Sequence, residues 1–300
     1  MKRAGRFIAV IVVLLTGCAA PAMDAAVPVI ETGVDPEAWV AVPAGPFLLG
    51  QHEVETEIDC DYEMMVTDVT IAQYARFLNA ALVSGDVKIT DNQIVGYYPG
   101  DVFHGHNHER EIAAGDWAYV TIGDPALRLD FDGSAFTVKS GYENHPMTMV
   151  SWFGARGYCN FSGWRLPTDT EWEKAARGTD NRPFPWGQEI APGSANFVSS
   201  HDVFERVFAG AGGTTPVGFY NGETYEGYVT RNAASPYGLY DMAGNVWQWT
   251  GDVYEGAHYR NLRGGSHANY AYNLRIWTHN NADPIHTSPS VGFRCARDGN

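Results

Sequence analysis

Three histidines and a glutamate lie close together in one polar segment of the chain. His104, His106 and His108 occupy alternate positions, and Glu109 follows the last of them. On an extended chain, side chains two positions apart point to the same face. Imidazole nitrogens are common ligands of zinc, copper and iron. The spacing is therefore compatible with a metal site on this segment, although a polar insertion of this kind favours solvated surface histidines.

The first eighteen residues have the pattern of a bacterial lipoprotein signal. Three basic residues precede an apolar run from Phe7 to Leu15, and the segment ends in Gly17 and Cys18. The run is shorter than the roughly 20 residues that cross a membrane, and it has the length of a signal-peptide core. We expect a signal peptide over residues 1–17 and lipidation of Cys18. Secretion with cleavage a few residues later is the alternative.

Export affects how the other cysteines are interpreted, because disulfides form and persist outside the cytoplasm. Cys60, Cys159 and Cys295 remain in the mature chain. One bridge would leave one thiol over, and spacing alone leaves all three pairings open. Residues 18–36, rich in Ala and Pro, predict a flexible tether after the lipidated cysteine.

The chain is strongly acidic, with 35 Asp and Glu residues against 20 Lys and Arg and a formal net charge of −15. Such a charge repels phosphate backbones, so we expect no nucleic-acid partner. Divalent cations and cationic partners suit this composition better.

Three helices are expected to position the candidate residues. Apolar side chains at helical spacing predict a helix over Thr70 to Leu82, and a second is expected to begin after Ser151. Thr168 and Glu171 form a capping box that begins a third. The rest of the chain consists of turns between short apolar pieces. It has no internal repeat or second linker, so we expect one domain over residues 37–300.

Six segments follow one another in an order that is typical of a known family. They are residues 42–50, 66–79, 145–178, 237–250, 262–266 and 291–295. Together they resemble the formylglycine-generating enzyme, or sulfatase-modifying factor, superfamily, and the resemblance covers nearly all of the mature chain. It implies an α+β fold, the family's variant of the C-type-lectin fold, which is low in regular secondary structure.

The resemblance also implies a pairing for the cysteines. In the family, a cysteine matching Cys159 is bridged to one matching Cys295, so we expect that disulfide here. Cys60 is then unpaired, and we expect it to be a buried, unreactive side chain.

The residues that carry the family's oxidation chemistry are missing from this chain. In the oxidase members, two cysteines after the Gly-Gly-Ser motif bind copper(I) and convert a substrate cysteine to formylglycine. Asn269 and Leu274 stand at those two positions here. An amide and an aliphatic side chain cannot form the two-thiolate site that copper(I) prefers. We therefore expect that this chain does not generate formylglycine.

Two histidines in the same segment also depart from the family pattern. His267 stands where the family usually has Trp, and His279 where it usually has Arg. One interpretation is a rebuilt site in which His267, Asn269 and His279 line the groove and imidazoles bind copper, iron or zinc. The other is a surface groove that changed after the thiols were lost.

Structural calcium is a further implication of the resemblance. The family binds it near an Asn matching Asn196 and at a motif matching Asn245 to Trp249. The candidate ligands are therefore Asn196, Asn245, Val246 and Gln248. Hard oxygen ligands in an acidic domain suit calcium. Gln248 replaces the usual Glu, which removes one negative charge from the site.

Two functions of different classes follow from these residues. The first is a membrane-tethered binding or scaffolding module that takes an envelope protein or peptide as its ligand. The second is a metal-dependent oxidase or hydroxylase with histidine ligands. Residual formylglycine-generating activity through Cys60 is a third hypothesis, and it requires Cys60 to reach the groove. Ala19 lacks the acidic character typical of inner-membrane retention, so we expect the outer membrane or the periplasmic side of the cell envelope.

Overall fold

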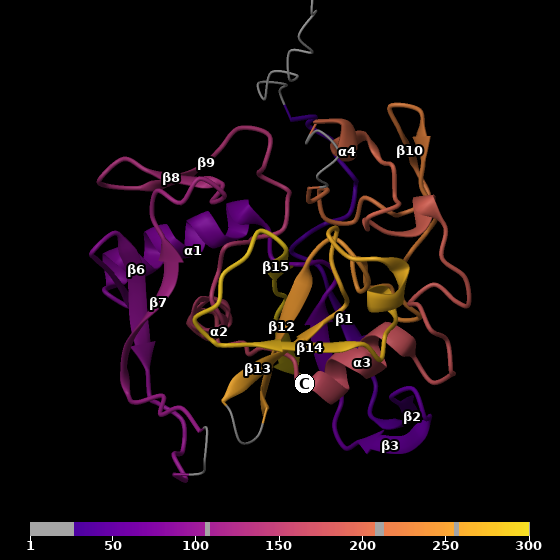
Figure 1. Ribbon diagram of the computed structural model, residues 1–300, viewed down its shortest axis with the longest axis horizontal. Coiled ribbons are helices and arrows are strands. Elements are labelled where there is room, and N and C mark those ends of the chain that lie inside the picture. Colours follow the sequence, from indigo (N-terminus) through magenta and orange to yellow (C-terminus); the bar gives the residue numbers. More distant parts are fainter. Residues whose placement is uncertain (1–26, 106–108, 208–212, 255–257, 300) are drawn as a thin grey trace, which may run out of the picture.

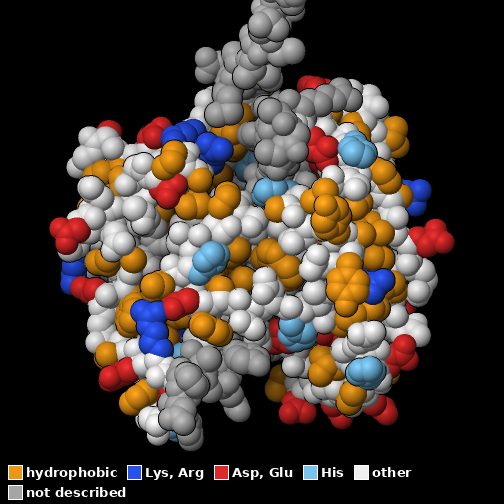
Figure 2. Space-filling model, in the orientation of Figure 1, with side chains coloured by type: hydrophobic (Ala, Val, Ile, Leu, Met, Phe, Trp, Pro, Cys, Tyr) orange, Lys and Arg blue, Asp and Glu red, His pale blue; other side chains and the backbone are white. Residues whose placement is uncertain are grey.

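The computed structural model describes residues 27–105, 109–207, 213–254 and 258–299. The expected signal peptide and Cys18 lie outside the described residues. No helix in the described part of the chain is long and apolar enough to cross a membrane. Short helices and small sheets surround a central sheet, and acidic side chains lie around the outer edge of the face shown in Figure 2 (Figures 1 and 2).

The three expected helices are confirmed, and side-chain caps explain where they begin. Thr70 caps the first through a capping box with Gln73, and Thr168 forms the same box with Glu171 at the third. Ser151 caps the second by accepting a hydrogen bond from a backbone N–H of the first turn. The described helices are α1 (Ile71–Ser84), α2 (Trp152–Phe161), α3 (Asp169–Arg177) and α4 (Val203–Val207), with 3₁₀ turns η1 (Pro192–Ser194) and η2 (Ala271–Leu274).

The central sheet has four strands in the order β14-β13-β12-β15. The strands are β12 (Trp247–Tyr254), β13 (Tyr259–Arg263), β14 (His279–Ala282) and β15 (Val291–Gly292). β13 runs antiparallel to both β12 and β14, whereas β15 runs parallel to β12. The register between β12 and β13 shifts between Trp249 and Val253. The sequence did not predict β12, because this irregularity interrupts its alternation of apolar and polar residues.

Two three-stranded sheets and three hairpins complete the β-structure. One sheet has the order β1-β4-β16 and the other the order β5-β6-β7. Their strands are β1 (Trp39–Val42), β4 (Tyr62–Met65), β16 (Ala296–Asp298), β5 (Val87–Thr90), β6 (Gln93–Tyr98) and β7 (Gly115–Thr121). The hairpins are β2 (Gly45–Leu49) with β3 (Val54–Ile58), β8 (Leu129–Phe131) with β9 (Phe136–Val138), and β10 (Thr224–Tyr225) with β11 (Tyr228–Val229).

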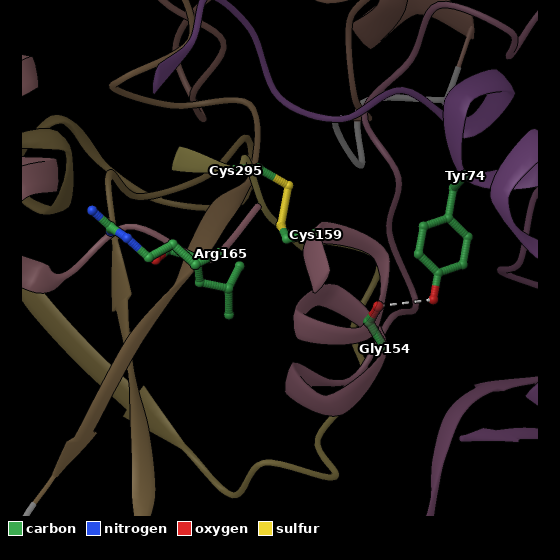
Figure 3. Close-up of a disulfide and its surroundings, with 6 residues drawn as sticks. Tyr74, Gly154, Cys159, Arg165 and Cys295 are labelled. Carbon is green, nitrogen blue, oxygen red and sulfur yellow. Dashed lines mark hydrogen bonds between the residues drawn. A yellow bond between two sulfur atoms is a disulfide. The ribbon is translucent and has the colours of Figure 1, made fainter. Parts of the chain in front are cut away.

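The main hydrophobic core lies between α1, α2 and the central sheet. Tyr74 of α1 donates a hydrogen bond from its hydroxyl group to the Gly154 carbonyl oxygen of α2 at 3.2 Å (Figure 3). The expected disulfide between Cys159 and Cys295 is confirmed and joins α2 to the last strands of the chain (Figure 3). Beside it, Arg165 forms an antiparallel bridge with Ala296. The disulfide therefore links α2 covalently to the connection between β15 and β16.

Two expectations about the less regular parts of the chain differ from the structure. Cys60 is exposed, not buried, because it lies in the connection between β3 and β4 instead of on a strand that faces the core. Residues 28–36 lie against the domain and are not a free tether. Ile30 is buried in a cluster with Phe204 and Phe219, and Thr32 donates to the Val217 carbonyl oxygen at 2.9 Å.

Removing the disulfide should destabilise the fold strongly. The bridge closes a loop with a sequence separation of 136 residues, which the chain-entropy model values at about 5 kcal/mol. We expect the Cys159→Ala/Cys295→Ala variant to lose a comparable free energy of unfolding in urea denaturation. Cys60→Ser is the matched control and should unfold at the wild-type midpoint, and equal midpoints for all three proteins would contradict the prediction.

Candidate functional site

The candidate site is built on a tight turn that follows β13. Gly264 and Gly265 both have positive φ angles, of 93° and 72°, which glycine adopts readily. A Cβ atom at Gly265 would lie 2.9 Å from the Asn273 carbonyl oxygen, so the close approach of η2 also requires glycine. The turn directs Ser266 and the residues after it back across the end of the central sheet.

The Asn269 side chain stabilises this turn through hydrogen bonds to Ser266. Its Oδ1 accepts hydrogen bonds from the Ser266 backbone N–H at 3.1 Å and from the Ser266 hydroxyl at 2.7 Å. Its backbone N–H also donates to the Ser266 carbonyl oxygen, and its carbonyl oxygen accepts from Val198. The amide at this position therefore serves as a local structural brace.

Leu274 is fully buried and belongs to the hydrophobic core. It packs in a cluster with Phe184, Ala195, Phe197 and Ala243. The two positions at which the oxidase members carry cysteines are therefore occupied by a turn brace and a core side chain. Neither side chain offers the soft ligand that copper(I) prefers.

His267 lines a cavity of about 370 Å³ next to the turn. It is only 8% exposed, and its Nε2 lies 3.4 Å from the Pro289 carbonyl oxygen. Its Nδ1 is buried, and no described residue forms a hydrogen bond with it. Burial lowers the pKa of His267, so the ring is neutral near pH 7.

The cavity is formed by segments far apart in the sequence. Arg128 lies on one wall with its guanidinium carbon 4.7 Å from the centre of the Tyr142 ring. The described lining residues include no Asp or Glu. They are Ile71, Ala126, Arg128, Tyr142, Thr148, Gly213, Thr214, His267, Ala268, Pro289 and Ser290.

His279 lies in a different environment from His267. It is exposed on β14, opposite Arg263 of β13, and its Nδ1 is 3.6 Å from Asp169 Oδ2. Partial burial and the neighbouring Arg263 guanidinium lower its pKa. The structure thus gives the two histidines different partners. In the described ranges, no group of three or more His, Cys, Asp or Glu side chains is arranged to hold a metal ion.

Cys60 does not lie in the turn that contains Asn269. Asp61, the next residue, accepts hydrogen bonds from the backbone N–H groups of Ala44 and Gly299. These contacts place the β3–β4 connection beside β2 and the C-terminal end. The third sequence hypothesis required this thiol to reach the groove, and the contacts of Asp61 and Asn269 give it no support.

The histidine-rich segment is described only in part. His106 and His108 lie outside the described residues. His104 is exposed, and both its backbone N–H and its Nδ1 contact Glu109 Oε1, at 2.9 Å and 3.2 Å. A metal site on this segment therefore stays a prediction.

His258 is a functional candidate that sequence reasoning missed. Its Nδ1 lies 2.9 Å from Asp101 Oδ2, and its Nε2 lies 2.8 Å from Glu109 Oε1. Arg260 also donates to Asp101 at 2.7 Å. The hydrogen bond to Glu109 is the main cause that raises the pKa of His258, and Asp101 contributes to the same shift. The ring joins the β12–β13 connection to the segment after β6.

Stability should depend on the protonation of His258. The folded pKa is raised above the unfolded value near 6.5, so the folded state binds the proton more tightly. Its stabilisation is complete below about pH 6.5 and is lost as the pH rises through the folded pKa. The unfolding free energy of His258→Gln should lack this decline. Urea titrations from about pH 5.5 to 9 test it, and parallel curves for both proteins would refute it.

The candidate calcium ligands Asn196 and Asn245 lie next to each other and are both buried. Asn196 Nδ2 donates to the Gly213 carbonyl oxygen at 2.7 Å and lies 3.4 Å from Asn245 Oδ1. The Asn245 side chain pairs with the backbone N–H and carbonyl of Thr215 at 3.1 Å and 3.2 Å. Val246 is also buried. Calcium at these residues stays a prediction.

Gln248 does not fit the role of a calcium ligand. Its Oε1 accepts hydrogen bonds from Trp172 Nε1 at 2.7 Å and from Arg294 Nε at 2.8 Å. Its Nε2 donates to the Asp241 carbonyl oxygen at 2.6 Å. A divalent cation bound to Oε1 would lie beside the Arg294 guanidinium, which repels it. The neutral Gln248 amide therefore satisfies hydrogen-bonding groups inside the core.

Two exposed tyrosines follow Asn269 on the surface. Tyr270 is 69% exposed and Tyr272 is 64% exposed, and the Arg275 guanidinium lies 4.8 Å from the centre of the Tyr272 ring. We call Tyr270 and Tyr272 the tyrosine surface. In the space-filling view, hydrophobic side chains and a basic side chain lie over the 3₁₀ turn η2, which is gold in Figure 1 (Figure 2). Because Ala268 lines the cavity, the tyrosine surface begins two residues from it.

Comparison with known proteins identifies the family. The sulfatase-modifying factor enzyme 1-like domain matches residues 26–299. The chain belongs to this family. It has the formylglycine-generating-enzyme variant of the C-type-lectin fold, as its motifs imply.

Curated relatives match half of the chain or more. The formylglycine-generating enzyme of Mus musculus is 28% identical over 291 residues, which cover 86% of this chain and 74% of the mouse protein. The enzyme of Thermomonospora curvata is 29% identical over 297 residues, which cover 86% and 93%. The inactive C-alpha-formylglycine-generating enzyme 2 of Bos taurus is 37% identical over 162 residues, which cover half of each chain.

Solved structures support the fold assignment. PvdO from Pseudomonas aeruginosa superposes with a TM-score of 0.56 at 21% identity and covers 87% of this chain and 94% of its own. CarF superposes with a TM-score of 0.53 at 21% identity and covers 88% and 98%. At this level of identity the similarity extends to the fold alone.

Proposed function

We propose that this sulfatase-modifying-factor domain is a binding module of the cell envelope and not a formylglycine-generating oxidase. The observation that carries the proposal is the environment of the two replaced cysteines. Asn269 braces a turn through Ser266, and Leu274 is buried in the core. The copper(I) chemistry of the oxidase members needs two thiolates, which this pair of side chains does not supply.

The surface beside this turn supports a binding role. Tyrosine side chains offer a large, rigid contact area together with a hydroxyl group, and they are common at interaction sites. The tyrosine surface begins two residues after Ala268, which lines the His267 cavity, and the two together offer a platform and a pocket. An extended peptide that crosses the platform could place one end in the pocket. We therefore propose an envelope protein or peptide as the ligand.

A lipid anchor is part of this proposal. Residues 1–17 have the signal-peptide pattern, and Cys18 stands at the position of a lipidated cysteine. Residues 28–36 pack on the domain, which would hold it near the anchor. Ala19 favours the outer membrane or the periplasmic side as the location. Growth with radiolabelled palmitate, followed by a Cys18→Ser comparison, measures the anchor directly.

The purified full-length chain should not convert a sulfatase-type cysteine peptide to its aldehyde. With copper(I) and air, we expect mass spectrometry to detect no formylglycine, because Asn269 and Leu274 provide no thiolate. The Thermomonospora curvata enzyme serves as the positive control under the same conditions. Aldehyde formation by this chain above a copper-only blank would contradict the proposed function.

Loss of the tyrosine surface should weaken peptide binding. We expect Tyr270→Ala/Tyr272→Ala to lower affinity for arrayed cell-envelope peptides by about tenfold, because each ring provides exposed contact area. Tyr97→Ala is the matched control, since Tyr97 is 65% exposed but lies on β6. Fluorescence polarisation measures the affinities. Equal losses in the double variant and the control would exclude the tyrosine surface.

A further inference from the structure

We propose that the His267 cavity binds the carboxylate end of a peptide, with Arg128 holding the carboxylate and His267 Nδ1 accepting the adjacent amide N–H. This inference rests on the proposed function and names the ligand class of that site. Two polar groups of the cavity carry it. His267 Nδ1 can accept a hydrogen bond, and the Arg128 guanidinium can pair with an anion.

The first group is a buried acceptor. The Pro289 carbonyl can only accept, so the 3.4 Å contact assigns the proton of the neutral His267 ring to Nε2. Nδ1 then presents a buried lone pair that no residue in the described ranges contacts as a donor. An unsatisfied buried acceptor is costly, and a ligand that donates an N–H or O–H removes that cost. The cavity therefore selects for a donor at this point.

The second group is a cation. The Arg128 guanidinium lies over the Tyr142 ring, and none of the ion pairs in the described part of the chain involves Arg128. The cavity wall itself contains no described Asp or Glu, although the chain carries 35 of them. A planar guanidinium pairs with a carboxylate through two parallel hydrogen bonds. This wall therefore favours an anionic ligand.

The remaining walls suit the rest of a peptide end. The hydroxyl groups of Thr148 and Ser290 can donate to carboxylate oxygens, and Ile71, Ala126 and the Tyr142 ring provide apolar surface. The volume of about 370 Å³ lies at the lower end of the range for small-ligand sites, which is roughly 300–1,000 Å³. A terminal residue and its preceding amide combine the required anion, donor and apolar side chain in one ligand.

Other ligand classes fit these groups less well. A phosphate group carries acceptor oxygens that would face the His267 lone pair, and Arg128 is the one cation among the described lining residues. A transition metal bound at Nδ1 would need further ligands. The described lining provides no second histidine, cysteine or carboxylate.

The experiment uses the full-length chain and isothermal titration calorimetry with N-acetyl-glycyl-phenylalanine. We expect the free acid to bind about tenfold more tightly than its C-terminal amide, and Arg128→Ala to remove this preference. Arg128→Lys should keep part of it. Arg76→Ala removes an exposed positive charge that is not part of the described cavity lining, and it should bind as the wild type does. Equal binding of acid and amide to the wild type would overturn the proposal.

The donor requirement is tested with an ester analogue in which oxygen replaces the N–H before the phenylalanine. We expect the wild type to bind the ester about tenfold more weakly than the amide-linked acid, and His267→Phe to bind both equally. Equal affinities in the wild type would overturn the role of Nδ1. N-acetylphenylalanine and a tetrapeptide acid distinguish a small metabolite from a chain end, and tighter binding of the metabolite would overturn the peptide assignment.

The outcomes separate this inference from the proposed function. Peptides that bind through the tyrosine surface with no preference for a free carboxylate would leave the binding module intact and remove the carboxylate pocket. Aldehyde formation from the cysteine peptide would instead remove the proposed function itself.

Discussion

The domain depends on the hydrogen bonds that the buried Arg294 guanidinium makes in its core. Burial lowers its pKa, and five acceptors surround it. It donates to Gln248 Oε1 and to the carbonyl oxygens of Met65, Val66 and Tyr240, and it pairs with Asp68. A charge removed from water is tolerated only when its hydrogen-bonding groups are satisfied. These contacts connect the C-terminal segment, β4 and β12 at one point.

This requirement explains the residue at position 248. An amide offers an acceptor to Arg294 and Trp172 and a donor to the Asp241 carbonyl at the same time. A carboxylate would lack that donor. The glutamine therefore completes a hydrogen-bond network between the central sheet and α3. The turn with Asn269 and His267 extends from the adjacent strand β13, so the cavity is supported by a rigid frame.

Sequence reasoning predicted the parts of the fold that local chemistry determines. Thr70, Ser151 and Thr168 begin helices because their side chains satisfy backbone N–H groups within a few residues. The disulfide and the fold followed from family motifs. The replacement by Asn269 and Leu274 was also evident in the sequence. The structure was needed to show that Asn269 braces a turn and that Leu274 is a core side chain.

The remaining features depend on contacts between distant segments. His258 acquires its role only because the β12–β13 connection meets Asp101 and Glu109, more than a hundred residues earlier in the chain. No periodicity or motif around His258 signals these partners. The cavity likewise combines Arg128 and His267 from segments on separate elements. Such sites follow from tertiary packing, which a single sequence does not encode in a local pattern.

The β1-β4-β16 sheet would have a mechanical consequence if the chain were held at its N-terminus, as proposed above. Tension would first reach the packed segment 28–36 and then β1, which is aligned with β4 over four residue pairs. The opposite edge of β4 holds β16, directly after the cysteine bridged to α2. Load would therefore pass into the covalently stapled half of the molecule. The turn that carries His267 follows β13 of the other sheet and lies outside that path, so it would keep its shape under such a pull.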